Sequence, residues 1–428
     1  MNEPNLLVIS NNSLSNNISN GRTLSGILYG WDKNKIAQIY VSGEAPQSEV
    51  CDNFFRITDK DILKGFLHPY SIGSKVKNEL SFKKQKPEIK KIKKTVFTIT
   101  ARDFIWNTGI WYNKKLKKWL EEFKPQAILF LTGESTFTFK MTLKIAKEYG
   151  IPIITFNSEG YYFKEKNYLK DSGISSLMYP IYHRAFVRTF NKFMKNTKYI
   201  IQLNNKLKND YDLCFDVPSI AQYASTNVKK ATVKPEHKIP QVSYLGNLGV
   251  GRHTSLCEIA DALQEINRDY HLDVYGKIPN DEVKKAFENC IGINYKGVVS
   301  YNDVVKIMHE SDLLVHAEGF NDFCRWDLKY AFTTKIADSL ACGTCFFVYA
   351  PEELACTEYL KNITCVVTDR AELKEKLSEL LGSKELQQKY ISASLKAAEK
   401  NHRTDVNCKK FKEILNEVLE ADYESASN

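Results

Sequence analysis

The stretch from Glu318 to Gly343, EGFNDFCRWDLKYAFTTKIADSLACG, has the residue types and spacing that say most about chemistry in this chain. An acidic residue follows a short apolar segment, Thr-Thr-Lys follows at 333–335, and Asp338 falls in the first turn of an apolar helical pattern. The first turn of a helix has unpaired N–H groups and partial positive charge, so Thr-Thr-Lys there suits a phosphate. A carboxylate one turn later could accept a hydrogen bond from a sugar hydroxyl. The stretch therefore indicates a ligand that carries both groups.

A second candidate is the glycine-containing turn from Tyr244 to Arg252, YLGNLGVGR. Glycine lets the backbone approach a ligand closely, and arginine can direct two parallel hydrogen bonds to phosphate oxygens. The spacing departs from the GxGxxG of dinucleotide sites, and no acidic residue ends the following strand. Two interpretations stay open: a phosphate-binding turn, or an ordinary strand-to-helix turn with an exposed arginine.

These segments need a scaffold, and the first half of the chain predicts one of alternating strands and helices. Strands separated by helices favour a parallel sheet that is covered on both faces. Strands are expected at Leu6–Ser10, Ile36–Tyr40, Thr95–Thr100, Ala127–Leu131 and Pro152–Phe156, with the clearest helices at Lys115–Phe123 and Phe139–Tyr149.

The segment 228–240 loses this periodicity and contains two prolines, so it predicts a linker. We therefore expect an α/β protein with domains at 1–235 and 236–400, and a C-terminal helix at 401–428 that could cross back to the first domain. Two such domains place ligand sites at the carboxyl ends of their strands, in the cleft between them. In the second half, strands are expected at Gln241–Leu245, Leu272–Tyr275, Ile293–Lys296, Leu313–Ala317 and Cys345–Tyr349, with helices at Ser255–Ile266, Asp281–Glu288, Tyr301–Glu310 and Lys335–Ala341.

Length and composition agree with two domains. At 428 residues and 43% hydrophobic content, the chain exceeds the roughly 250 to 300 residues at which single cores stop growing. No signal-peptide pattern opens the sequence, and no apolar run approaches the roughly 20 residues that span a bilayer, so the expected location is the cytoplasm. Ten cysteines, with a lone CxxC at Cys342 and Cys345, are expected as reduced core thiols rather than disulfides or a zinc site.

The formal net charge of +9 is unevenly distributed. Seven of the twelve residues 83–94, KKQKPEIKKIKK, are lysines, and further lysines fall within 114–118. Such a run is often a solvated face, and the alternative is an acidic partner. No recognition helix, RNP-like pattern or zinc module supports nucleic acid. The segment Leu177–Phe193 mixes aromatic, aliphatic and basic residues as interfacial helices do, so we favour an anionic membrane surface, with the protein peripheral on its inner face.

The order of these motifs resembles that of GT-B glycosyltransferases, most of all the bacterial GT4-type enzymes that build surface polysaccharides. The resemblance covers about 240–365, and across 1–230 it is one of architecture alone. It implies two Rossmann-like domains that face each other across a cleft. The matching segments are Tyr244 to Arg252, LDVYG at 272–276, KGVVS at 296–300, Glu318-Gly-Phe, and KIADSLACG at 335–343.

The resemblance also implies roles for single residues. Glu318 takes the place of the first Glu of the family's Glu-x7-Glu motif, as a catalytic residue near the donor sugar, and Asp338 takes the place of the second, at the ribose. Arg252 and Lys335 would hold the diphosphate. Two departures from the pattern are an insertion, Asn321–Phe332, and the Asp in place of the second Glu. The insertion could contact donor or acceptor, or form an ordinary surface loop. The other expected nucleotide-sugar contacts are Asn247, Gly249, Thr333 and Thr334, with Gly276, Lys277 and Val299 near the base.

The activity implied is transfer from a nucleotide diphosphate sugar, with a UDP-sugar as the expected donor, to a glycan or lipid-linked glycan. Fixed cations near the leaving diphosphate lower the barrier, and Arg252 with Lys335 could replace a metal, so neither metal nor cofactor is expected. GT4-type enzymes retain anomeric configuration, so the resemblance implies retention. Two alternatives remain: a nucleotide-sugar 2-epimerase, and a non-catalytic GT-B partner subunit.

The acceptor side has fewer signals. The polar segment 11–22 after the first strand ends in Asn20, Gly21 and Arg22, where GT-B enzymes bring a glycine-containing loop towards donor and acceptor. A polar turn that caps a helix is the alternative. Glu134 follows the fourth strand as an acceptor-binding candidate. Glu159 follows the fifth, as a candidate catalytic residue that orients or deprotonates an acceptor hydroxyl.

Overall fold

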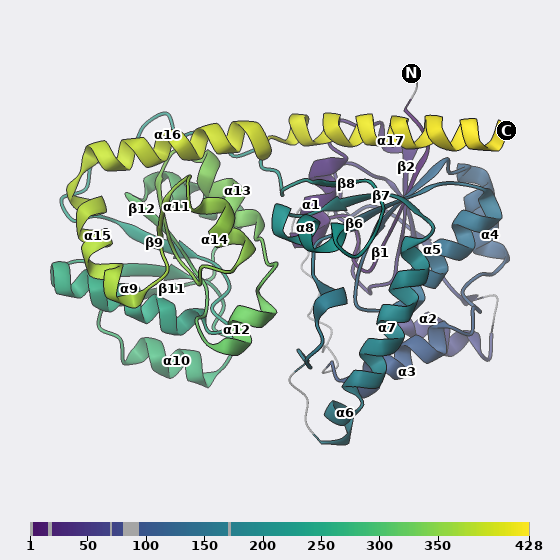
Figure 1. The fold of residues 1–428 in the computed structure, drawn as a ribbon, viewed down its shortest axis with the longest axis horizontal. Helices are drawn as coiled ribbons and strands as arrows, with labels where there is room; N and C mark the ends of the chain where they lie inside the picture. The colour runs from purple at the N-terminus through teal and green to yellow at the C-terminus, as the bar shows by residue number, and fades with distance from the viewer. Residues whose placement is uncertain (1–2, 16–18, 69–70, 80–93, 170–172, 428) are drawn as a thin grey trace. The chain divides into compact units, whose positions relative to one another are not determined.

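The computed structural model describes residues 3–15, 19–68, 71–79, 94–169 and 173–427 (Figure 1). Its contacts divide the chain into a first unit, Met1–Gln222 with Asn407–Asn428, and a second unit, Tyr223–Val406. Residues just before the predicted linker belong to the second unit because the backbone N–H of Thr226 donates to the carbonyl of His402. The C-terminal residues from Asn407 onward belong to the first unit.

The first unit is built on an eight-stranded sheet of order β4-β3-β2-β1-β5-β6-β7-β8. All neighbouring strands are parallel except β3 and β4, which are antiparallel. The central strands are buried along their whole length, as expected for a parallel sheet covered on both faces. The strands are β1 (Leu6–Ser10), β2 (Ile36–Tyr40), β3 (Asn53–Arg56), β4 (Ser74–Val76), β5 (Ala127–Leu131), β6 (Ile153–Asn157), β7 (Thr197–Gln202) and β8 (Ser219–Ala221).

Helices surround this sheet in Figure 1. The last of them, α17 (Thr404–Ser427), begins in the second unit and lies mostly in the first. The others are α1 (Ser19–Ile27), α2 (Asp59–Gly65), α3 (Val96–Trp106), α4 (Lys114–Phe123), α5 (Thr136–Tyr149), α6 (Ile174–Leu177), α7 (Tyr179–Met194) and α8 (Asn205–Asp212).

The strand predicted at Thr95–Thr100 is wrong, because these residues begin helix α3. Thr95 and Thr98 form a reciprocal cap: the Thr95 hydroxyl accepts from the Thr98 N–H at 3.1 Å, and the Thr95 N–H donates to the Thr98 hydroxyl at 2.9 Å. A run of β-branched residues suggests a strand, but two satisfied backbone donors stabilise a helix start. Residues 83–93 of the lysine-rich run lie outside the described residues, whereas Lys94 is exposed.

The second unit has a six-stranded, all-parallel sheet of order β11-β10-β9-β12-β13-β14. This is a doubly wound order. The chain first adds strands on one side of β9 and then, from β12 onward, on the other side, so the strand order reverses between β9 and β12. Ligands bind beyond the carboxyl ends of the strands at such a reversal. The strands are β9 (Val242–Leu245), β10 (Leu272–Tyr275), β11 (Ile293–Gly297), β12 (Leu313–Ala317), β13 (Cys345–Tyr349) and β14 (Cys365–Val367).

The predicted elements of this unit are confirmed within about one turn, and several coincide with the observed bounds. The insertion Asn321–Phe332 contains a short helix, α12, which is capped by the Asn321 side chain. The fold class, two parallel-sheet Rossmann-like units, is also confirmed. The helices are α9 (Arg252–Ile266), α10 (Asp281–Glu288), α11 (Tyr301–Glu310), α12 (Asp322–Asp327), α13 (Thr334–Ala341), α14 (Ala355–Leu360), α15 (Leu373–Gly382) and α16 (Lys384–Asn401).

Candidate functional site

The turn between β9 and α9 is shaped by its glycines. Val250 and Gly251 both have left-handed backbone angles, with φ of 57° and 74°. A Cβ on Gly251 would also lie 2.7 Å from the Cys324 Sγ, so only glycine fits there. Gly251 is the N-cap of α9, and Arg252 is the first residue of that helix. The turn therefore fixes where the arginine side chain starts.

Arg252 forms a buried ion pair with Glu318 at the carboxyl end of β12. The Arg252 Nη2 lies 2.9 Å from Glu318 Oε1 and 2.7 Å from Oε2. The side chains are 12% and 3% exposed, respectively. Burial favours the neutral acid, but Arg252 and His316 outweigh it and hold the pKa of Glu318 below its usual range. The pair is therefore ionised at neutral pH.

His316 is a neighbour of this pair that the sequence analysis missed. Its Nε2 lies 3.4 Å from Glu318 Oε1. The two residues are two positions apart on and just after β12, and side chains two apart on a strand point to the same face. That spacing was the available signal. Ser255 of α9 was also missed, and its hydroxyl donates to the Glu318 carbonyl at 2.7 Å.

A cavity of about 100 Å³ opens beside the ion pair. Its lining brings together two predicted cations, Arg252 and Lys335, with Glu318 and Thr333. The residues come from the β9–α9 turn, the end of β12 and the start of α13, so the sheet reversal point positions all of them. The remaining lining residues are Tyr244, Leu245, Gly246, Asn247, Met308, Leu314, Val315, His316, Ile336, Ser339 and Phe346.

The start of α13 contributes the Thr-Thr-Lys sequence. Thr333 is the N-cap, and its hydroxyl accepts from the Lys335 N–H at 3.4 Å. Thr334 is buried and Lys335 is half-buried. The helix N-terminus and one lysine thus face the cavity that Arg252 also lines, as phosphate binding requires.

Asp338 lies apart from this cavity. Its side chain is fully buried, and its Oδ1 accepts from the Thr226 hydroxyl at 2.6 Å. Thr226 in turn bonds to the backbone of His402, whose Nδ1 lies 2.7 Å from the Ala224 carbonyl. The carboxylate expected at the ribose therefore joins α13 to residues 224–226 in this structure.

The residues expected near the base take different positions. Gly276 lies against the glycine turn, since a Cβ there would be 2.2 Å from the Gly246 carbonyl oxygen. Lys277 is exposed and Val299 is half-buried, and neither is among the described residues that line the cavity. Gly249 N–H donates to the Asn247 side chain at 2.9 Å, so the two stabilise the turn itself.

The insertion packs against the glycine turn. The Cys324 thiol contacts the Val250 carbonyl at 3.2 Å, and Arg325 Nε donates to the Phe320 carbonyl at 2.7 Å. Arg325 also pairs with Glu353 at 2.8 Å. The insertion is thus an ordered helix that supports the turn, and none of its residues is among the described ones that line the cavity.

In the first unit, two predicted carboxylates follow adjacent strands. Glu134 comes after β5, and its side chain is 11% exposed. Its Oε2 accepts from the Tyr168 hydroxyl at 2.8 Å, and its Oε1 pairs with Lys94. Burial raises the pKa of Tyr168 far above its usual value, so this phenol stays a donor. Glu159 is half-buried and follows β6, which pairs with β5 in parallel.

The segment after β1 is partly helical rather than a loop. Gly21 and Arg22 lie in the first turn of α1, and the side chain of Asn20 falls outside the described residues. Gly21 packs tightly, since a Cβ there would be 2.7 Å from the Ser15 nitrogen. Gly133 after β5 meets the Asn11 side chain in the same way. The ends of β1 and β5 therefore meet at the sheet reversal point of this unit.

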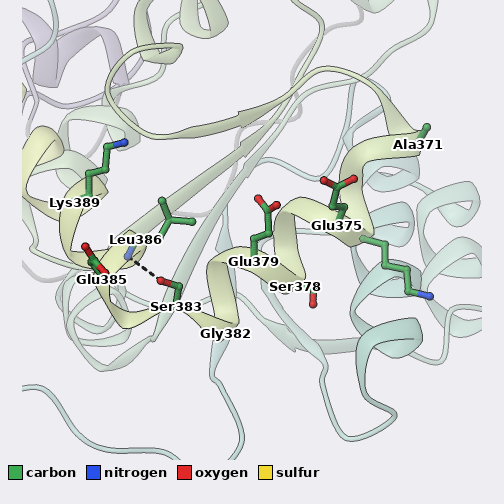
Figure 2. A pocket seen from close by; sticks show the side chains of 10 residues that line it. Ala371, Glu375, Ser378, Glu379, Gly382, Ser383, Glu385, Leu386 and Lys389 are labelled. Carbon is green, nitrogen blue, oxygen red and sulfur yellow. Dashed lines mark hydrogen bonds between the residues drawn. The ribbon is translucent and has the colours of Figure 1, made fainter.

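A larger, open groove lies between α15 and α16, where none of the predicted site residues is found (Figure 2). Its volume is about 1170 Å³, and charges of both signs line it, including Lys374, Glu375, Glu379 and Lys389. The hydroxyl of Ser383 accepts from the Leu386 N–H at 3.1 Å and caps α16 there. Mixed charges with an internal cap are typical of a solvated helix junction.

Membrane-spanning helices and metal-binding clusters are both absent from the part of the chain that the structure describes. Among the described residues, no helix is both long and apolar enough to cross a bilayer. The same residues contain no group of three or more His, Cys, Asp or Glu side chains placed to hold a metal ion.

Comparisons with known proteins bear on both units. Residues 252–413 match a family model described as glycosyl transferase-like. No curated protein sequence matches this chain. Among solved structures, HepE from Anabaena is similar with a TM-score of 0.61 at 10% identity, over 96% of this chain and 99% of that chain. Sucrose-phosphate synthase from Thermosynechococcus elongatus has a TM-score of 0.61 at 9% identity, over 97% and 99%.

A glycosyltransferase from Rickettsia africae has a TM-score of 0.58 at 14% identity, over 98% of this chain and 99% of that chain. At such low identities, the structural likeness shows the fold, and it extends over both units. The family match covers the segment that contains Arg252, Glu318 and Lys335. Together they confirm the resemblance to GT-B glycosyltransferases: the chain has the GT-B fold, and residues 252–413 match a glycosyl transferase-like family model.

Proposed function

We propose that this protein transfers a sugar from a nucleotide diphosphate sugar, with UDP-sugar as the donor. The observation that carries the proposal is that Arg252 and Lys335, from distant parts of the chain, line one cavity at the sheet reversal point of the second unit. The start of α13 lies at the same place. The structurally similar HepE is described as a complex with UDP and glucose, which supports the choice of base.

The ion pair explains how a phosphate could bind next to Glu318. The Arg252 contacts to Glu318 use Nη2, while Nη1 has a long 3.4 Å contact to the Gly249 carbonyl. Arginine has five N–H donors, so the remaining ones can serve phosphate oxygens while Glu318 holds the group in place. Glu318 is then a positioning residue for Arg252 as well as the proposed neighbour of the donor sugar.

During transfer, the bond between the anomeric carbon and the phosphate oxygen breaks, and the diphosphate leaves with the electron pair. Arg252, Lys335 and the N-terminus of α13 would stabilise this charge, and we propose that they do so without a metal or cofactor. The acceptor oxygen bonds to the anomeric carbon and releases its proton. We propose Glu159 as the group that takes this proton. Glu134 is already paired with Lys94, which suits an orienting role.

The finer assignments follow from the family resemblance and belong to the same proposal. They are retention of anomeric configuration, a glycan or lipid-linked glycan as acceptor, and a role in bacterial surface polysaccharide synthesis at the cytoplasmic side of the membrane. Product stereochemistry, read by NMR of the new glycosidic bond, tests retention directly.

A nucleotide panel tests the donor. UDP, GDP, ADP and CMP, with their sugars, are added in thermal-shift, calorimetric and product-release measurements. We expect UDP compounds to stabilise the protein and Lys335→Ala to weaken binding by about ten- to a hundredfold, since a hydrogen bond to a charged group contributes about 1.5–3 kcal/mol. Lys374→Ala is the matched control, because Lys374 is 57% exposed on α15 and lies outside the cavity. If no nucleotide stabilises the protein and Lys335→Ala binds like the parent, the proposal is wrong.

A further inference from the structure

Three helices of the first unit expose large apolar side chains at one end. Helices α3, α6 and α7 pack on a small buried cluster that includes Val96, Ile99, Tyr179 and Tyr182. The Phe97 N–H donates to the Ser175 hydroxyl at 3.2 Å, which places the start of α3 beside α6. The outward side chains, which we call the α3–α6–α7 face, are Phe97 (63% exposed), Phe104 (77%), Ile174 (79%), Leu177 (79%) and Ile181 (68%).

Such side chains contribute little to the core, because they are largely exposed while the cluster beneath them is buried. Figure 1 shows α6 with the adjoining ends of α3 and α7 at one end of the unit, away from the sheet. Helix α2, which packs on α3, adds the exposed Leu63, Phe66 and Leu67. Large exposed apolar side chains gathered on neighbouring helices are typical of an interaction site.

The charges beside this face point to one kind of partner. On α7, Arg184, Arg188 and Lys192 are exposed and four residues apart, so they form a row along one side of the helix. Leu177 and Ile181 lie on the N-terminal continuation of the same side. Helices α3, α6 and α7 contain a single acidic residue, Asp103, and it is buried. On α2, Asp59 is exposed, and it pairs with Arg102 of α3 at 2.7 Å. The exposed apolar side chains of α6 and α7, followed by the cations of α7, match an anionic bilayer surface.

Distances along α7 agree with that arrangement. At about 1.5 Å rise per residue, Arg184 and Arg188 lie roughly 5 and 10 Å along the helix from Ile181. Interfacial apolar groups enter a bilayer by about 5–10 Å. If α7 meets the bilayer end-on, with Leu177 and Ile181 in the acyl boundary, the two arginines therefore lie at the level of the lipid headgroups.

Residues beside the α3–α6–α7 face contact Glu134, the proposed acceptor-orienting residue at the carboxyl end of β5. Tyr182, the neighbour of Ile181, donates its hydroxyl to the Glu134 carbonyl at 2.9 Å. Lys94, three residues before Phe97, pairs with the Glu134 carboxylate. The end of β5 thus lies directly behind the exposed apolar side chains, within the first unit alone.

We propose that the α3–α6–α7 face docks on an anionic membrane surface, and that the acceptor is an amphiphile whose lipid part stays in that membrane while its polar head reaches Glu134. The part of this inference that concerns the acceptor rests on the proposed glycosyl transfer. The docking itself depends on the first unit and can be tested without any substrate.

The test is co-sedimentation of the full chain with vesicles of phosphatidylcholine, with and without phosphatidylglycerol. We expect pelleting with the anionic vesicles, a decrease at high salt, and at least about a tenfold loss of partitioning for Leu177→Glu with Ile181→Glu, because buried apolar area and anionic-lipid attraction together set such binding. Arg184→Glu with Arg188→Glu should lose the preference for anionic lipid. Leu213→Glu is the matched control, since Leu213 is 86% exposed in the same unit and lies outside the face.

Phe97→Ser with Phe104→Ser is a second variant, and all of these positions are exposed, so thermal melting should be unchanged. Equal pelleting with neutral and anionic vesicles, no pelleting at all, or the same loss in Leu213→Glu overturns the inference. UDP stabilisation is measured on every variant and should equal that of the parent. Vesicle binding that persists while no nucleotide stabilises the protein would refute the proposed transfer and leave the docking intact.

Discussion

Replacing Arg252 by methionine should destabilise the second unit far more than replacing both members of its ion pair. The substitution leaves the Glu318 carboxylate, whose side chain is 3% exposed, without its guanidinium partner, and the His316 Nε2 remains 3.4 Å away. Breaking a buried pair by removing one partner costs about 3–5 kcal/mol, because an uncompensated charge remains buried. The double variant Arg252→Met with Glu318→Gln removes that charge and should recover most of the loss.

The pH dependence of stability tests the same reasoning independently, because the parent and Arg252→Met should respond in opposite directions. In the parent, the pKa of Glu318 is depressed, so the pair's contribution is complete above the unfolded value, about 4.3, and is lost as pH falls through the lower folded value. In Arg252→Met, burial dominates and raises the carboxyl pKa, so protonation favours the folded state. The deficit of this variant relative to the parent should therefore shrink as pH falls from 7 towards 4.

Hydrogen exchange in urea measures this prediction, because peptides from α9 and β12 report the second unit separately from the first. Arg370→Met is the matched control: Arg370 pairs with Glu258 at 3.6 Å and is 68% exposed. A long ion pair with an exposed cation contributes about 0–1 kcal/mol, and Glu258 keeps its hydrogen bond from the Tyr349 hydroxyl at 2.8 Å. The reasoning is refuted if Arg252→Met is no more destabilising than Arg370→Met, or if the double variant is as unstable as the single one.

Three further predictions concern the cluster around Asp338 and the cavity. Thr226→Val should lower stability by about 1–3 kcal/mol in chemical denaturation, because the buried Asp338 loses a hydroxyl donor, whereas a loss below about 0.5 kcal/mol would contradict the contact. Burial lowers the pKa of His402 to about 4. The unfolded state therefore takes up a proton first as pH falls, and about 3 kcal/mol of stability should be lost between roughly pH 6.5 and 4. His402→Gln should remove this decrease of stability with falling pH, as measured by thermal melting at a series of pH values. An unchanged decrease would show that another group causes it. Ser339→Ala, at a cavity-lining position one residue beyond Asp338, should change UDP affinity less than Lys335→Ala in the same calorimetry, and the reverse order would move the phosphate subsite.

Buried central strands could be predicted from the sequence because each is a continuous apolar run. The predicted bounds Leu313–Ala317 and Cys345–Tyr349 are those of β12 and β13, which are buried throughout. Strands β4 and β8 were missed because they have three residues each and are partly exposed, so neither leaves an apolar signature. At Thr95–Thr100, the run of β-branched residues was a weaker determinant than the capping pair.

The candidate site could be predicted as segments but not as contacts. The turn at 246–252 and the start of α13 were found because glycine, threonine and lysine at a strand-to-helix junction have a local meaning. The partners Arg252 and Glu318 are 66 residues apart, and Asp338 and Thr226 are 112 apart, and no local spacing encodes either pair. His316 was within reach, since a period of two on β12 places it beside Glu318.

The Arg252–Glu318 ion pair indicates a structural role for the insertion Asn321–Phe332, which the sequence alone did not predict. A cation stabilises a departing diphosphate best when it is fixed before the reaction begins, since no reorganisation is then needed. Glu318 holds the end of the Arg252 side chain, and Gly251 sets where its backbone begins. Cys324 of α12 packs on that glycine and contacts the Val250 carbonyl. The insertion between the two acidic residues therefore supports the turn that carries Arg252, next to the proposed phosphate subsite.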